Sequence, residues 1–189
     1  VITFVVAPES GYVAKYAIGE GAAVAVKDNT FTVTADAAKT ITISFVLAPT
    51  ETTVTKTIAE VATANGWENG TLYPSIDLGD VTINLTATPV GTYGQNTGKY
   101  YTSGNEWRTY QNESPAIAIA AKEGFTIVSV KITYNYSKGG VLTNDSENVK
   151  SGTVVNVNAA SITFGVGNTG TETKGQVKIT AIEVVYAAA

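Results

Sequence analysis

Apolar and polar residues alternate along most of the chain, as is typical of strands that have one buried and one solvated face. The alternation is clearest over residues 2–6, 41–45, 81–87 and 162–166. Turn-forming pairs such as Asp28-Asn29, Asn69-Gly70 and Gly139-Gly140 separate these runs. The pattern predicts an all-β fold whose strand content exceeds its helix content by more than about fivefold.

Two longer runs, 125–136 and 177–186, change the parity of their apolar residues midway. In the first, the apolar set moves from Phe125 and Ile127 to Val128 and Val130. In the second, it likewise moves to the other parity after residue 179. One extra residue that reverses the faces is a β-bulge, so both runs are predicted to be long, bent, central strands.

One segment has helical rather than strand signals. Thr57 and Glu60 have the spacing of a capping box, and Asn65-Gly66 is a natural helix end. An apolar stripe lies between them at Ile58, Val61 and Ala62. These residues predict a helix of about two turns.

The stretch before this helix divides the chain. Residues 49–56 are predicted to be an extended linker between a small β-rich repeat domain, 1–48, and a larger module, 57–189. About 48 residues is near the lower limit for independent folding without crosslinks, so the first domain is not expected to fold alone. The second is predicted to be an antiparallel β-sandwich, jelly-roll-like, with one short helix.

Composition narrows the chemistry. The chain has no Cys and no His, which excludes disulfides, the usual zinc sites and nucleophiles activated by an imidazole. A net charge of −4 with 12 basic residues argues against nucleic acid as a partner. No run approaches the roughly 18 apolar residues of a membrane span. We therefore expect no cofactor, no metal, no membrane insertion and no enzymatic activity.

Several motifs resemble known bacterial modules. The motifs of the larger module lie at 64–70, 98–101, 105–108, 127–134 and 175–182. Over 56–186 the chain resembles a C-terminal β-sandwich module of large secreted and surface proteins of anaerobic bacteria. Residues 1–48 resemble a short bacterial β-repeat distantly similar to internalin-type repeats. The resemblance implies an extracellular place on the bacterial cell surface and implies no reaction.

Acidic residues are the candidates for acid–base catalysis and for calcium binding. The two carboxylate pairs are Asp77 with Asp80 and Glu106 with Glu113, and a glycosidase would need its pair about 5 to 9.5 Å apart. The acidic turn at 144–147 offers oxygen ligands without the spacing of a calcium loop. Solvated strand ends and polar turns explain all of these residues, and they are favoured over catalysis and over calcium binding.

The most informative cluster is aromatic and contains Tyr93, Tyr100, Tyr101, Trp107, Arg108 and Tyr110. Rings on Gly-rich loops can form a sugar-stacking platform, or Trp107 can belong to the core. Strand alternation over 105–111 places Glu106, Arg108 and Tyr110 on one face and Trp107 and Thr109 on the other. We predict that Trp107 is buried and that Tyr100, Tyr101, Arg108 and Tyr110 bind a ligand or partner.

Three functions remain open. The first is a non-catalytic extracellular structural or adhesive module, possibly a subunit of a surface filament. Its partners would be neighbouring domains or copies of itself, joined through strand edges at 1–6 and 177–186, and possibly glycans. The alternative is a carbohydrate-binding module, and a more distant one is a hydrolase fragment.

Overall fold

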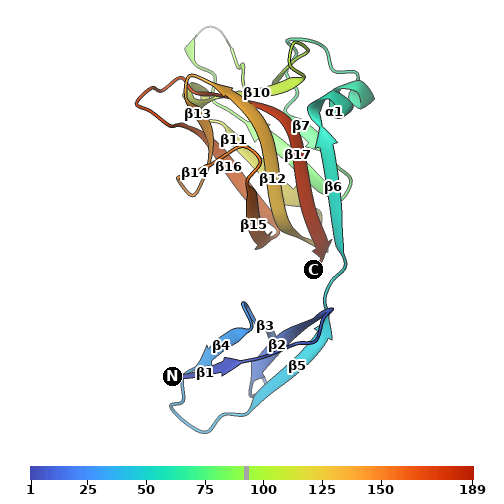
Figure 1. Ribbon diagram of the computed structural model, residues 1–189, viewed down its shortest axis with the longest axis vertical. Helices are drawn as coiled ribbons and strands as arrows, with labels where there is room; N and C mark the ends of the chain where they lie inside the picture. Colours follow the sequence, from blue (N-terminus) through green and yellow to red (C-terminus); the bar gives the residue numbers. More distant parts are fainter. Residues whose placement is uncertain (92–93) are drawn as a thin grey trace. The chain divides into compact units, whose positions relative to one another are not determined.

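The computed structural model describes residues 1–91 and 94–189, in two units, Val1–Thr50 and Glu51–Ala189 (Figure 1). Strands hold 56% of the residues and helices 6%, which confirms the predicted excess of strand over helix. The fold is all-β, and its sheets are antiparallel.

The first unit is built from five short strands. β1 (Ile2–Val5) pairs with β4 (Thr30–Val33), and β2 (Tyr12–Ile18) lies between β3 (Val24–Ala25) and β5 (Ile41–Leu47). Its buried core is small and consists of Val6, Ala14, Phe31 and Val33. Strand β5 leaves Phe45 and Leu47 exposed. Such a small core is consistent with the argument that this domain is too small to fold alone. That it does not fold alone stays a prediction.

The second unit contains two six-stranded sheets. The first sheet has the order β15 (Val154–Ala159), β12 (Phe125–Ser137), β17 (Gln176–Ala188), β10 (Glu106–Tyr110), β9 (Lys99–Tyr101), with β6 (Glu51–Thr57) also paired to β17. The second has the order β14 (Glu147–Val149), β13 (Gly140–Asn144), β16 (Ser161–Asn168), β11 (Ala116–Ala121), β8 (Val81–Thr86), β7 (Ser75–Asp77). A 3-10 turn, Gln111–Glu113, follows β10.

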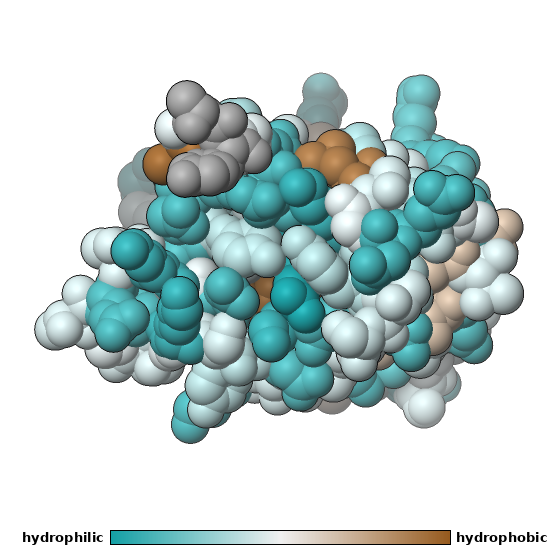
Figure 2. All heavy atoms as spheres, turned by 90° about the horizontal axis from the view of Figure 1, so that it is seen from above, coloured by the Kyte–Doolittle hydropathy of each residue, from teal (hydrophilic) through white to brown (hydrophobic). Residues whose placement is uncertain are grey.

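The core of this unit joins the two sheets. Trp107, Ile179 and Val184 of the first sheet share one buried cluster with Ile117 and Phe164 of the second. This is the core of a β-sandwich-like fold, as predicted. Figure 2 shows one face of the molecule, mostly hydrophilic with small hydrophobic patches, as expected when apolar side chains turn inward.

Both predicted bulges are present where the two longest strands pair. The register of β12 against β17 shifts between Ile127 and Ser129, which leaves Val128 as the extra residue. A second shift lies between Thr133 and Tyr134, where Thr180 of β17 is extra. The parity change in the sequence is therefore a direct record of these bulges.

The predicted helix is α1 (Ile58–Asn65). Thr57 and Glu60 form the complete capping box: Glu60 N–H donates to Thr57 Oγ1 (3.1 Å), and Thr57 N–H donates to Glu60 Oε2 (2.8 Å). Gly66 ends the helix with a left-handed φ of 63°. Within the described residues, no helix is long and apolar enough to cross a membrane.

Two predictions about organisation were wrong. The expected linker at 49–56 is mostly strand β6, which pairs with β17 from Glu51 onward. Its Thr-rich sequence looked like a linker because an edge strand needs few apolar residues. The last strand is also not an edge, because β17 pairs with β12 on one side and with β10 and β6 on the other (Figure 1). The first strand, β1, is an edge strand as predicted: among the described strands it pairs with β4 alone.

Candidate functional site

Strand β10 divides its side chains as the alternation predicted. Trp107 and Thr109 are fully buried, whereas Arg108 and Tyr110 are half-buried on the opposite side. The Trp107 indole N–H donates to the carbonyls of Tyr73 and Gly98, both at 2.9 Å. The strand is therefore anchored by its inner face and presents Arg108 on its outer one.

Tyr100 is not on the outer face, contrary to the prediction. It lies directly opposite Trp107 and is only 4% exposed. Its hydroxyl donates to Asn105 Oδ1 at 2.8 Å. Because neighbouring residues of a strand point to opposite faces, only Tyr101 of the Tyr100-Tyr101 pair faces outward. Tyr93, the remaining aromatic of the cluster, lies outside the described residues.

Arg108 is held in place from two sides. Its Nε and Nη2 both lie 2.9 Å from Glu106 Oε2. Its guanidinium carbon lies 4.0 Å from the centroid of the Tyr101 ring, a close cation–π contact. Glu106 is itself mostly buried, which the sequence did not indicate. The guanidinium is thus oriented before any ligand arrives.

Tyr110 completes this group. Burial raises the pKa of its hydroxyl to about 12, and the neighbouring Tyr101 adds to the shift while Arg108 acts against it. Like any tyrosine hydroxyl at neutral pH it is protonated, so it can donate a hydrogen bond. Tyr101, Arg108 and Tyr110 together, with Glu106 behind them, make up the aromatic–arginine cluster.

Two lysines lie beside this cluster and were missed in the sequence. Arg108 of β10 is directly opposite Lys99 of β9 and directly opposite Lys178 of β17. Directly opposite residues share a face, so the three cations form one line across three strands. We call this line the basic row. Only the strand register, which joins residues about eighty positions apart, reveals it.

A buried carboxylate accepts hydrogen bonds from the backbone just before β9. Glu113 is 3% exposed and accepts hydrogen bonds from the backbone N–H groups of Asn96 (3.0 Å) and Thr97 (2.6 Å). The Thr97 hydroxyl in turn accepts a bond from the N–H of Tyr110 at 3.0 Å. These bonds satisfy the buried charge and fix this approach to the cluster.

The other carboxylates considered for catalysis also have structural partners. Asp77 accepts a bond from the N–H of Gly79 at 2.9 Å. Asp80 accepts one from the Tyr186 hydroxyl at 3.3 Å. Glu106 and Glu113 are engaged by Arg108 and by backbone N–H groups, as described above. Each of the four is thus accounted for by local structure.

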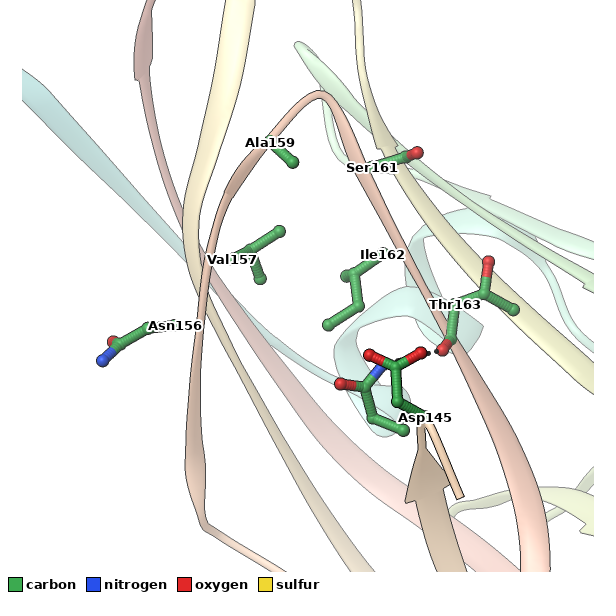
Figure 3. A pocket seen from close by; sticks show the side chains of 8 residues that line it. Asp145, Asn156, Val157, Ala159, Ser161, Ile162 and Thr163 are labelled. Carbon is green, nitrogen blue, oxygen red and sulfur yellow. Dashed lines mark hydrogen bonds between the residues drawn. The ribbon is translucent and has the colours of Figure 1, made fainter. Parts of the chain in front are cut away.

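The acidic turn at 144–147 borders a hollow of about 340 Å³. Figure 3 shows its lining, which consists of Asn144, Asp145, Asn156, Val157, Ala159, Ser161, Ile162 and Thr163. The Asn144 amide donates to the Thr163 carbonyl at 3.2 Å. Asp145 and Ser146 have φ of 48° and 70°, as in a two-residue hairpin turn, which explains their polarity. Among the described residues, no three acidic side chains gather as metal ligands.

Comparison with known proteins finds no match to this chain among family models, curated proteins or solved structures. The resemblance to modules of bacterial surface proteins therefore remains an expectation from the motifs in the sequence.

Proposed function

We propose that this chain is a non-catalytic, extracellular adhesive module of a bacterial surface protein. In this proposal, it holds its partner on the outer face of β9, β10 and β17. The observation that supports it is the fixed guanidinium of Arg108, gripped by Glu106 and stacked on Tyr101. The extracellular setting follows from the family resemblance.

A preoriented arginine suits binding. Association costs free energy for every flexible side chain that it orders, and Arg108 is already ordered by two contacts. Arginine and tyrosine are the residue types most enriched at binding hot spots, together with tryptophan. The cluster also stands on a strand whose inner face is the core, which keeps it in position.

The non-catalytic part of the proposal has its own support. The sequence has no Cys and no His to act as nucleophile or base. The four carboxylates considered as hydrolase pairs are engaged by Arg108, backbone N–H groups or Tyr186. Carbohydrate binding stays compatible with this reading, because it needs no reacting group.

Assembly of several copies through strand edges is a second candidate function, since β6 and β15 are both edge strands of the first sheet. Strand β6 is mostly exposed, and among the described residues its pairing partner is β17 alone. An added strand could continue the sheet there, as in β-augmentation. Negative-stain imaging of purified protein tests this: fibres would favour the filament reading, and separate single particles would count against it.

The test of the adhesive reading is a double substitution, Glu106→Gln with Arg108→Gln. Replacing both partners removes the guanidinium without leaving the buried carboxylate unpaired, so the unfolding free energy should change by less than about 1.5 kcal/mol. Binding to a printed glycan array and to immobilised matrix proteins should fall at least about tenfold, as expected for a hot-spot arginine.

A matched control exists on the same sheet. Lys131 of β12 and Glu183 of β17 form an ion pair at 2.9 Å and are more exposed than Arg108 and Glu106. The double variant Lys131→Gln with Glu183→Gln should bind like the wild type. Equal binding by the Glu106/Arg108 variant and the wild type, with both folded, would contradict the proposed function.

A further inference from the structure

We infer that the basic row, Lys99, Arg108 and Lys178, binds the carboxylate groups of an acidic polysaccharide. This deepens the proposed function, on which it rests, by naming the chemical class of the ligand. The inference comes from the charge, spacing and surroundings of the row.

The first step is the spacing of the three cations. They occupy directly opposite positions on β9, β10 and β17. Adjacent strands lie roughly 4.8 Å apart, so the row spans about 10 Å. Like charges directly opposite one another destabilise a sheet, and three in line are therefore a cost to the unliganded fold. An anion lying along the row removes that repulsion.

The second step is the charge balance. Within the described part of the chain, the ion pairs are Lys39 with Asp36, Arg108 with Glu106, and Lys131 with Glu183. Glu106 thus pairs with one cation of the row, and none of these ion pairs includes Lys99 or Lys178. Lys99 is still oriented, because its ammonium donates to Asn96 Oδ1 at 3.0 Å. A local excess of positive charge lies on a protein whose net charge is −4.

The third step is the neutral polar surround. Tyr110 is directly opposite Gln176, whose Oε1 accepts a bond from Ser137 Oγ at 2.9 Å. This bond orients the Gln176 carboxamide and leaves its amide N–H groups as further donors on the same face as Tyr110. Asn135 is directly opposite Lys178 at the end of the row. Hydroxyls and amides around a few cations match a ligand that carries many hydroxyls and few charges.

This combination favours an acidic glycan over other polyanions. Nucleic acid carries a charge on every phosphate and needs a wide positive field, whereas the net charge here is negative. An extended acidic peptide would gain most by pairing its backbone with a sheet edge. The basic row instead crosses the face of the sheet, with β10 and β17 paired on both sides.

The probes are polygalacturonate, hyaluronate and polysialic acid, each beside its methyl-esterified form, which keeps the sugars and removes the charge. Poly-glutamate and single-stranded DNA serve as the other anions. Affinity for the intact chain is measured by biolayer interferometry at low and high salt. We expect at least one carboxylated polysaccharide to bind more tightly than its ester and to weaken as salt rises.

The substitutions are Lys99→Gln with Lys178→Gln, compared with Lys150→Gln, which removes an exposed charge elsewhere. The lysine double variant should melt at or slightly above the wild-type temperature, because repulsion along the row is relieved. It should bind the polysaccharide about tenfold more weakly, because two charge contacts are lost. The Lys150 variant should bind like the wild type.

Three results would overturn the inference: no carboxylated polysaccharide binds, the esters bind equally well, or poly-glutamate or DNA binds more tightly than every polysaccharide. If a neutral glycan binds and the Glu106/Arg108 double variant abolishes this, the inference fails while the proposed function stands. If no variant of either set alters any binding, both fail.

Discussion

Trp107→Ala is expected to lower the free energy of unfolding by about 3 to 5 kcal/mol, the range for removing a fully buried large aromatic. The ring packs against Trp67, with centroids 6.2 Å apart, inside the main core. Its N–H also satisfies the carbonyls of Tyr73 and Gly98. Alanine would leave a cavity and two carbonyls without this donor.

Denaturant unfolding followed by circular dichroism measures this effect. Tyr136→Ala is the control, because Tyr136 is 65% exposed on strand β12 and its loss should cost under about 1 kcal/mol. A Trp107→Ala protein as stable as the wild type would mean that the inner and outer faces of β10 have been assigned the wrong way round.

Gly140→Ala is expected to cost about 3 kcal/mol or more, at the upper end for overpacking. A Cβ atom at Gly140 would lie 2.3 Å from the carbonyl oxygen and 2.5 Å from the nitrogen of Gln176. Both are backbone atoms of β17, which cannot rotate away as a side chain can. The start of β13 would have to move off the central strand of the first sheet.

Gly170→Ala is the matched control for this substitution. Its Cβ would meet only Asn168 Oδ1 at 3.5 Å, an ordinary contact, and its backbone is not left-handed. Thermal unfolding should therefore leave the Gly170 variant close to the wild type and lower the melting temperature of the Gly140 variant strongly. Equal melting temperatures for the two variants would show that β13 and β17 do not approach as closely as described.

Local features of the fold were predictable from the sequence. The helix was recognisable because its capping box and left-handed end depend on Thr57, Glu60 and Gly66, which are close together in the chain. The bulges at Val128 and Thr180 were recognisable because each reverses the parity of one strand. Such signals need no knowledge of which strands are partners.

Features that depend on strand partners were not predictable. Alternation required one of Tyr100 and Tyr101 to face inward, but only the pairing of Tyr100 with Trp107 decides which. Lys99 and Lys178 join Arg108 through the same kind of register information. The sequence of strand β6 resembles a linker because its one half-buried apolar residue, Val54, is covered only through pairing with β17.

We propose that a partner binds the outer face of β9, β10 and β17. Mapping the residues that a bound ligand contacts tests this most directly. Amide chemical shifts would be followed by NMR while the tightest-binding glycan of the array is added to the isotope-labelled chain. We predict that the largest shifts fall at Tyr101, Arg108, Tyr110 and Lys178. Shifts concentrated at Asp145, beside the hollow, or at Phe45 of β5 would contradict the claim.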